Sequence, residues 1–182
     1  MSNDHETRDS LTKPESTHPA GSSPGSPAHT ATIEFAWTDG SVDCTLPFPA
    51  AKECGGLVHF VGTTRDETHP EFGPLVALDY EAHRTVAEHS IRTISTNAAR
   101  RFDARAIRVR HAIGRVPLTE ASVVIEVACP HRAEAFDAAR FIIDQLKRQA
   151  AIWKQEVWTR GNTWSTGTPA NQSAGEDEAE RS

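Results

Sequence analysis

A histidine and an arginine stand side by side where a helix is predicted to begin, and they form the first candidate anion site. Pro130, His131 and Arg132 separate a β-rich run from a helical pattern that starts near Ala133. The first amides of a helix lack internal partners and carry a partial positive charge. An imidazole and a guanidinium beside them could bind a phosphate or a carboxylate. Taken alone, the dipeptide is better explained by a capping His131 and an exposed Arg132.

Two lysines in the run LKRQAAIWKQE are the candidates for acid, base or nucleophilic chemistry. Lys147 follows Leu146 at the margin of an apolar helical stripe, and Lys154 follows Trp153 in an extended run. An amine held near apolar groups or another cation can take part in proton transfer or nucleophilic attack. The alternative is that both are solubilising lysines and that Lys147 interacts with the helix dipole. Without further information the alternative is favoured.

Two further residues have open interpretations. Arg65 ends a β-rich run and precedes a Pro-rich loop, so it could bind an anion or pair with Asp66 or Glu67. Cys129 stands two residues before His131, which would suit a Cys–His nucleophile. A cysteine at the end of a buried strand is more commonly a small apolar residue, and this reading is favoured.

The remaining histidines and cysteines do not indicate a metal centre. His59 and His111 fall on apolar faces of predicted strands, where packed and hydrogen-bonded histidines are expected. Cys44, Cys54 and Cys129 include no CxxC pair, which argues against a zinc site and a disulfide framework. We therefore expect no bound metal and a reducing, cytoplasmic location.

The elements that position these side chains follow from hydrophobic periodicity. Apolar residues are expected to face inward at Val76, Leu78 and Tyr80 of one strand, at Val86, Ser90, Ile91, Ile94, Ala98 and Phe102 of a first helix, and at Ala135, Phe136, Ala139, Ile142, Ile143 and Leu146 of a second. The predicted strands are 31–37, 42–49, 56–65, 76–81, 106–113, 122–129, 152–158 and 162–164, with a loop at 66–74 and a helix at 85–102. This order has too few βαβ units for a doubly wound fold and predicts an α+β domain with a mostly antiparallel sheet and two helices.

The ends of the chain differ in composition from its centre. Residues 1–30 and 167–182 are polar with few large apolar side chains, so we expect them to be disordered tails around one domain at 31–166. Residues 51–166 carry 16 Lys or Arg against 14 Asp or Glu, and the other segments carry 3 against 11. The domain has no concentrated basic stripe for nucleic acid and no apolar run of the length that spans a bilayer.

The candidate residues occur in one order that resembles the MoaE family, the large subunits of molybdopterin synthase. The matching stretches cover nearly all of the predicted domain: GGLVHFVGTTRDE, VALDYEAH, AIRVRHAIGRV, VVIEVACPHRAEAFDAARFIIDQLKRQAAIWKQE and GNTW. The resemblance implies an α/β hammerhead-like fold with a small extra antiparallel sheet. It also implies a homodimer that binds two small ubiquitin-like sulfur-carrier subunits of the MoaD type, which gives a heterotetramer.

The resemblance further implies a sulfurtransferase of molybdenum cofactor biosynthesis. The carrier's C-terminal Gly-Gly thiocarboxylate would deliver two sulfurs in turn to cyclic pyranopterin monophosphate, which forms the molybdopterin dithiolene without a bound cofactor. The resemblance implies that Lys147 and Lys154 are the catalytic residues and that both also contact the substrate. The other residues that match substrate-contacting positions are Thr63, Thr64, Arg65, His131, Arg132, Gln155 and Glu156.

The sequence departs from the family pattern at four positions and in one loop. Ala112 stands where an arginine commonly follows the strand histidine, and Thr119 replaces a turn glycine. Ala151 replaces a proline, Gln155 replaces a basic residue, and the loop after Arg65 lacks a common asparagine. None of these changes removes a candidate catalytic group. Two alternatives stay open: a non-catalytic module that binds the carrier, and an unrelated phosphate-ester enzyme such as a phosphotransferase.

Overall fold

The computed structural model describes residues 30–46, 48 and 52–165, so the expectations for the two tails lie outside the described residues apart from Thr30. Within these residues the chain forms eight strands and two helices. The elements are β1 (Thr32–Asp39), β2 (Gly56–Thr63), β3 (Thr68–His69), β4 (Gly73–Ala82), α1 (Arg84–Phe102), β5 (Ala106–Pro117), β6 (Ala121–Cys129), α2 (Arg132–Gln149), β7 (Ile152–Trp158) and β8 (Gly161–Trp164).

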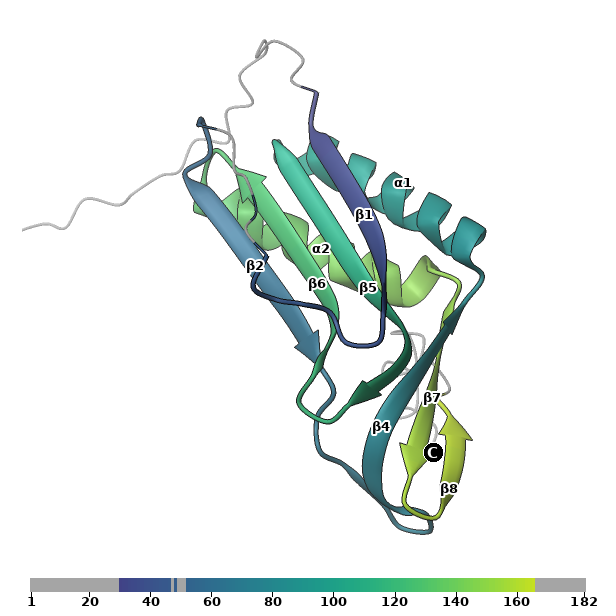
Figure 1. The fold of residues 1–182 in the computed structure, drawn as a ribbon. Helices are drawn as coiled ribbons and strands as arrows, with labels where there is room; N and C mark the ends of the chain where they lie inside the picture. The colour runs from purple at the N-terminus through teal and green to yellow at the C-terminus, as the bar shows by residue number, and fades with distance from the viewer. Residues whose placement is uncertain (1–29, 47, 49–51, 166–182) are drawn as a thin grey trace, which may run out of the picture.

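All strands belong to one sheet with the order β2-β6-β5-β4-β7-β8, to which β1 adds beside β5 and β3 beside β4. In the described part of the chain, β1–β5 is the one parallel pair. The long strand β5 joins two regions: its first half pairs with β1 and β6, and its end pairs with β4 (Figure 1). The predicted α+β class with a mostly antiparallel sheet and a small extra antiparallel part, β4–β7–β8, is confirmed.

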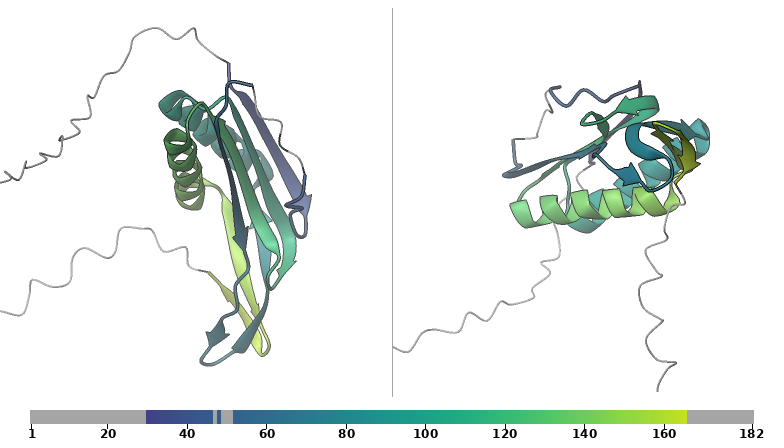
Figure 2. Two further views of the ribbon diagram at one scale, coloured as in Figure 1. Left: turned by 90° about the vertical axis from the view of Figure 1, so that its left-hand side faces the viewer. Right: turned by 90° about the horizontal axis from the view of Figure 1, so that it is seen from below.

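Both helices cover the same face of the β2–β6–β5–β1 region (Figure 2). The buried residues of α2 recur at three and four positions, which is the period of a helix with one face on a core. They pack with α1 residues such as Ile91 and Ile94 and with strand residues such as Val109, Ile125 and Val127. Glu134 in the first turn of α2 and Lys147 with Arg148 in the last turn suit the helix dipole. Neither α1 nor α2 is apolar enough along its length to cross a membrane.

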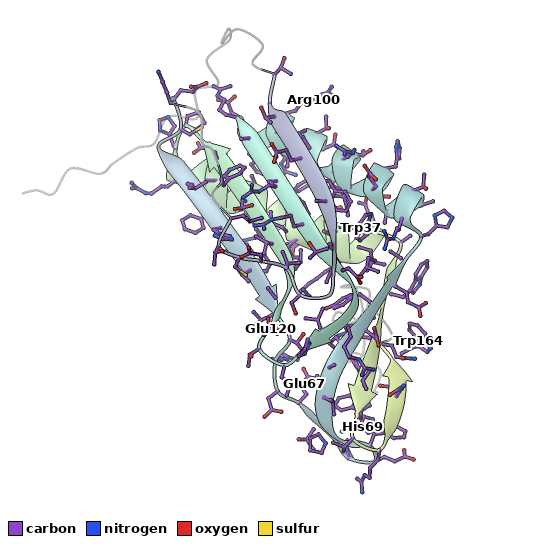
Figure 3. The ribbon with its side chains drawn as sticks, viewed as in Figure 1. Trp37, Glu67, His69, Arg100, Glu120 and Trp164 are labelled. Atoms are coloured by element: carbon purple, nitrogen blue, oxygen red, sulfur yellow. The ribbon has the colours of Figure 1, made fainter. Side chains whose placement is uncertain are left out.

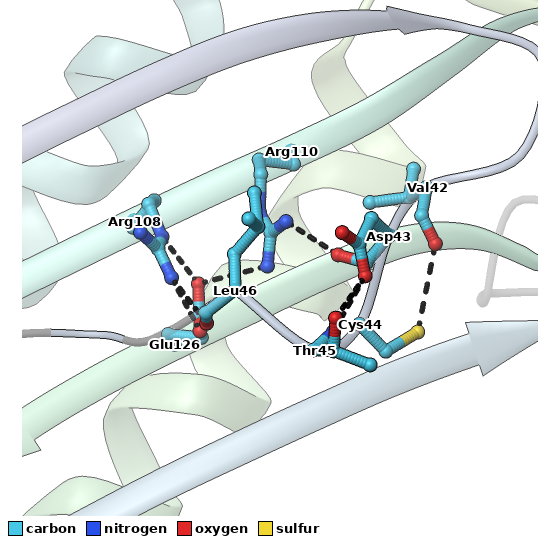
Figure 4. Close-up of polar contacts among 8 residues, drawn as sticks. All are labelled: Val42, Asp43, Cys44, Thr45, Leu46, Arg108, Arg110 and Glu126. Atoms are coloured by element: carbon cyan, nitrogen blue, oxygen red, sulfur yellow. Dashed lines mark hydrogen bonds and ion pairs between the residues drawn. The ribbon is translucent and has the colours of Figure 1, made fainter.

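The predicted strand at 42–49 is wrong over its described residues. Residues 42–46 form an irregular segment that crosses the face of the sheet away from the helices, and residues 47 and 49 lie outside the described part. Polar side chains of the sheet bind its backbone: the Arg110 guanidinium donates to the Asp43 carbonyl, and Arg108 Nη2 donates to the Leu46 carbonyl at 3.1 Å (Figure 4). Carbonyls that bind side chains in this way are not available for a strand ladder. The predicted loop at 66–74 is correct except for the short β3 and for Gly73 and Pro74, which begin β4.

Several side chains expected inside are exposed. Val76, Val86 and Phe136 are 46%, 48% and 62% exposed. A register shift between Leu75 and Ala77 turns Val76 outward, since one extra residue reverses the alternation. Ala87 rather than Val86 faces the core in α1, and Ala138 rather than Phe136 does so in α2. His59 was also expected inside and is exposed, on the sheet face opposite the helices.

Candidate functional site

A cavity of about 750 Å³ opens where the end of α2 meets the strands of both sheet regions. Its volume lies within the range of small-molecule sites. Five of the nine residues expected to contact substrate line it: Thr63, Arg65, Lys147, Lys154 and Glu156. Apolar groups of both sheet regions and of α2 form much of the remaining wall, including Phe60, Leu78, Ile143, Leu146 and Ile152.

The two lysines reach this cavity from different elements. Lys147 lies in the last turn of α2, one residue after the buried Leu146. The helix ends when the Ala150 N–H donates to the Leu146 carbonyl at 3.0 Å, and the chain then turns directly into β7, which carries Lys154. The Lys154 amine lies 3.4 Å from Glu156 Oε1, and both residues are partly buried. A short helix-to-strand connection therefore brings two amines and a carboxylate to one cavity.

The strand end that precedes the Pro-rich loop supplies the third cation. The Arg65 guanidinium donates to Glu67, and the Arg65 side chain is 83% exposed at the mouth of the cavity. Thr64 is buried, and its backbone pairs with the β5–β6 turn: Thr64 N–H donates to the Glu120 carbonyl and Thr119 N–H to the Thr64 carbonyl. Figure 3 shows Glu67 and Glu120 at this junction of the two sheet regions. Thr64 thus fixes the backbone beside Arg65 rather than lining the cavity.

Three uncharged polar side chains, none of them among the residues singled out for substrate, line the same cavity. Tyr80, His111 and Ser122 come from three neighbouring strands, and the Tyr80 and His111 rings meet edge to face at 5.3 Å. Burial raises the pKa of Tyr80, while a hydrogen bond with Ser122 lowers it by less. Burial also lowers the pKa of His111, whose Nδ1 lies 2.9 Å from the Ala112 carbonyl, so the imidazole is neutral at physiological pH.

The expected burial of His111 with a hydrogen bond is confirmed, but its place at the cavity was missed. The alternation of β4 already placed Tyr80 inward, on the same face as Leu78. This alternation was the one feature of the sequence that could have indicated Tyr80 as a residue of the cavity. It could not find Ser122, since β6 is buried on both faces and shows no alternation.

His131 and Arg132 lie at the other end of α2. The helix begins at Arg132, and His131 is its N-cap residue without a side-chain capping bond, so the predicted position at a helix start is correct. The pair lines a separate cavity of about 490 Å³. Gly56 permits this arrangement, because a Cβ there would lie 2.6 Å from the His131 carbonyl oxygen. Fifteen residues of helix separate Arg132 from Lys147, about 22 Å at 1.5 Å per residue.

The cationic residues that were all expected to contact one substrate therefore do not line one cavity within a single chain. The structure brings Arg65, Lys147 and Lys154 together and leaves His131 and Arg132 apart from them. Gln155 does not line the cavity either, since successive side chains of β7 point to opposite faces of the sheet. Among residues 30–46, 48 and 52–165, no three His, Cys, Asp or Glu side chains gather as a metal site requires.

Cys129 does not have the properties of a nucleophile. It is buried, and burial raises the pKa of its thiol to about 12. Since the thiolate is the reactive form, this residue is a packed part of the core, as favoured from the sequence. Among the tryptophans, Trp158 is buried, whereas Trp153 and Trp164 are 53% and 52% exposed.

Comparison with known proteins gives consistent matches. The MoaE protein family matches residues 38–149. The human molybdopterin synthase catalytic subunit is 36% identical over 72% of this chain and 69% of its own length, and the Arabidopsis thaliana subunit is 40% identical over 65% and 59%.

Solved structures agree with these matches. Molybdopterin synthase from Staphylococcus aureus has a TM-score of 0.59 and 29% identity, with 63% of this chain and 82% of that chain covered. The MoaE protein from Burkholderia ambifaria has a TM-score of 0.55 and 26% identity, with 74% and 88% covered. A family match over more than half of the chain, together with this fold and this order of cationic residues, shows that the chain belongs to the MoaE family.

Proposed function

We propose that this chain is the catalytic subunit of a molybdopterin synthase. It transfers two sulfurs from the thiocarboxylated C-terminus of a small ubiquitin-like carrier to cyclic pyranopterin monophosphate and so forms the molybdopterin dithiolene. The observation that carries the proposal is the convergence of Lys147 and Lys154, from a helix end and a strand, on one cavity with Arg65 at its mouth. The family membership supplies the reaction.

The charges of this cavity suit the reaction. The substrate carries a phosphate, the attacking sulfur is anionic, and opening of the cyclic phosphate develops further negative charge. Fixed cations stabilise such charge most strongly where water is partly excluded, and each contact contributes on the order of 3 kcal/mol to transition-state stabilisation. An ammonium group can also give a proton to a leaving oxygen. Lys147 and Lys154 are the proposed catalytic residues, and Thr63, Arg65 and Glu156 contact substrate.

The neutral groups of the cavity suit the pterin. Tyr80, His111 and Ser122 offer hydroxyl and imidazole groups without net charge beside the apolar Phe60. A heterocycle with amide and amino edges forms hydrogen bonds to such groups without an ion to desolvate. The sulfur comes from the carrier, so the proposed reaction uses no bound metal or cofactor.

The proposed assembly is a homodimer of this chain with one carrier on each subunit. His131 and Arg132 cannot reach the lysines of their own chain, so we propose that they act at the site of the second subunit as its phosphate contact. A two-fold axis places the same surface of each subunit against the other, which lets one helix start approach the partner's cavity. We also propose a cytoplasmic location, which suits three cysteines that form no disulfide with one another.

The decisive experiment is reconstitution with purified protein, thiocarboxylated carrier and cyclic pyranopterin monophosphate, followed by measurement of molybdopterin. Lys147→Ala should lower kcat by roughly 100-fold or more, because an amine at the reacting centre is lost. Arg148→Ala is the matched control: it removes the neighbouring cation of the same helix turn, which does not line the cavity, and should keep near-normal turnover. Circular dichroism checks that both variants are folded.

Each alternative function has its own outcome in this assay. No molybdopterin from the wild-type protein with an authentic carrier would favour a module that only binds the carrier. Turnover of phosphate esters without any carrier would favour a phosphotransferase. Normal product formation by Lys147→Ala would remove Lys147 from the mechanism.

A further inference from the structure

A chain of hydrogen bonds runs from the interior of the β7–β8 hairpin to the Lys154 amine. The Trp158 indole N–H donates to Thr163 Oγ1 at 2.8 Å, and the Thr163 hydroxyl donates to Glu156 Oε2 at 3.0 Å. The other oxygen of that carboxylate, Oε1, lies 3.4 Å from Lys154 Nζ. Lys154 and Glu156 line the catalytic cavity, whereas Thr163 and Trp158 lie behind them.

The register of the hairpin creates this chain. Glu156 pairs directly with Thr163, and Trp158 pairs with Gly161. Since side chains alternate along a strand, Lys154, Glu156 and Trp158 share one face of β7. Thr163 stands opposite Glu156, at the distance where cross-strand side chains meet. The register of the hairpin therefore places the side chains of Trp158, Thr163, Glu156 and Lys154 in a row.

The direction of each hydrogen bond is fixed by chemistry. An indole N–H can only donate, so the Thr163 oxygen must accept from Trp158. The single hydroxyl proton of Thr163 is then left for Glu156, whose carboxylate only accepts. Trp158 is 7% exposed and packs with Leu75 and Leu78, so this end of the chain is held in a core. The other end is a lysine whose side chain is 35% exposed.

We propose that Thr163 is a positioning residue for Lys154, which it orients through Glu156. The proposal rests on the proposed function, in which the Lys154 amine acts at the substrate. A lysine is a point charge on a flexible stem, and it keeps one place only if a fixed partner holds it. Thr163 holds the carboxylate so that Oε2 faces the hairpin and Oε1 faces the amine. A small displacement of a reacting group costs rate even when substrate still binds.

The competing explanation is structural: Thr163 would only fasten β8 to β7. The two explanations differ in the kinetic constant that changes. A positioning role predicts a lower kcat with little change in KM, because the interaction matters most at the reacting centre. A purely structural role predicts a less stable protein whose folded fraction turns over normally.

The kinetic test uses Thr163→Val, which removes the hydroxyl at nearly constant shape, and Thr163→Ser, which keeps it. With thiocarboxylated carrier, Thr163→Val should lower kcat for molybdopterin by roughly tenfold with KM for the pterin within about twofold of wild type. Thr163→Ser should restore most of the rate. Thr32→Val, an exposed threonine of β1 outside the cavity, is the control and should not change the rate.

A double variant separates position from stability. Thr163→Val leaves the buried Trp158 N–H without its acceptor, which weakens the hairpin. Trp158→Phe combined with Thr163→Val removes both polar partners and relieves that cost. The positioning role predicts that kcat stays low in the double variant. A kcat that recovers together with stability would overturn it.

A readout without substrate tests the same placement independently of activity. The rate at which an acylating reagent modifies Lys154 is measured by peptide mass spectrometry and divided by the rate at the exposed Lys52. An amine that is no longer held against a fixed carboxylate is more accessible to the reagent, so Thr163→Val should raise this ratio by about threefold or more, and Thr163→Ser should not.

Two results are decisive and distinct. The positioning role is overturned if Thr163→Val keeps either kcat or the Lys154 labelling ratio within about twofold of wild type. A wild-type protein that makes no molybdopterin, while its Lys154 labelling responds to Thr163, would instead overturn the proposed function and support the placement of the amine.

Discussion

Thr119 occupies a backbone conformation that suits glycine better than a β-branched residue. Its φ is +68°, and it is the third residue of a turn closed by the Glu120 N–H and the Pro117 carbonyl at 3.3 Å. The family resemblance also places a glycine here. Thr119→Gly should raise the free energy of unfolding by about 0.5–1 kcal/mol, because it removes a strained Cβ that outweighs the entropy glycine adds to the unfolded chain.

Urea denaturation followed by circular dichroism measures this change. Thr93→Gly on the exposed side of α1 is the control with the opposite sign, and it should lower stability by a few tenths of a kcal/mol. A less stable Thr119→Gly protein would mean that the Thr119 side chain makes contacts that outweigh its backbone strain.

At the same scale, the local pattern alone did not single out the two lysines. Lys147 beside Leu146 and Lys154 after Trp153 were better explained as solubilising residues, and only the order of motifs that resembles the MoaE family made them candidates. The structure places both in the larger cavity. Gln155 was carried over with its neighbours although a strand turns adjacent side chains to opposite faces. The hydrogen bond between Thr163 and Glu156 depends on which residues of β7 and β8 pair. The sequence pattern within either strand does not determine that register.

At the scale of elements, two arginines of β5 and one glutamate of β6 form a nearly buried cluster on the face away from the helices (Figure 4). Arg108 donates to both oxygens of Glu126, at 2.5 and 2.8 Å, and Arg110 donates to Oε2 at 3.4 Å. Glu126 is 2% exposed. Arg110 also donates to the Asp43 carbonyl, and Arg108 donates to the Leu46 carbonyl. The cluster therefore binds the segment 42–46 to the face of the sheet.

Glu126→Ala should lower the free energy of unfolding by about 3–5 kcal/mol, because it leaves two guanidinium groups without their carboxylate. Glu126→Gln keeps the shape and part of the hydrogen bonding and should lose less. Glu88→Ala on α1 is the control: its exposed pair with Arg92 contributes about 0.3–0.5 kcal/mol. Urea denaturation compares the three variants. A loss below about 1 kcal/mol for Glu126→Ala would mean that the cluster is as weak as an exposed ion pair.

Elements were predictable where periodicity is long and regular, and they were missed where tertiary contacts decide. Both helices and most strands follow from their patterns. The segment 42–46 has strand-like residues, but its carbonyls bind Arg108 and Arg110, which are more than sixty residues away. The outward turn of Val76 comes from a register shift against β7 that β4 alone does not encode.

At the scale of the whole molecule, α2 separates two groups of cations. Lys147 at its end lines the larger cavity, and His131 with Arg132 at its start lines the smaller one. A helix is rigid over the roughly 22 Å between them, so no bend of this element can unite the groups. The sequence predicts the residues of both groups, but linear order cannot tell whether one chain or two form a site. In the proposed homodimer, the start of the partner's α2 supplies the cations that this chain's own α2 cannot bring to the lysine cavity.

Mixed dimers test this arrangement. Lys147→Ala and Arg132→Ala should each be inactive alone, since each lacks one part of every site. After the two proteins are unfolded, mixed in equal amounts and refolded, half of the dimers contain one subunit of each kind. In such a dimer one site lacks both groups, and the other has an intact Lys147 and the partner's intact Arg132. Activity should therefore return to about a quarter of wild type. If each chain formed its site alone, mixing would restore nothing, and the role of Arg132 in the partner's site would have to be abandoned.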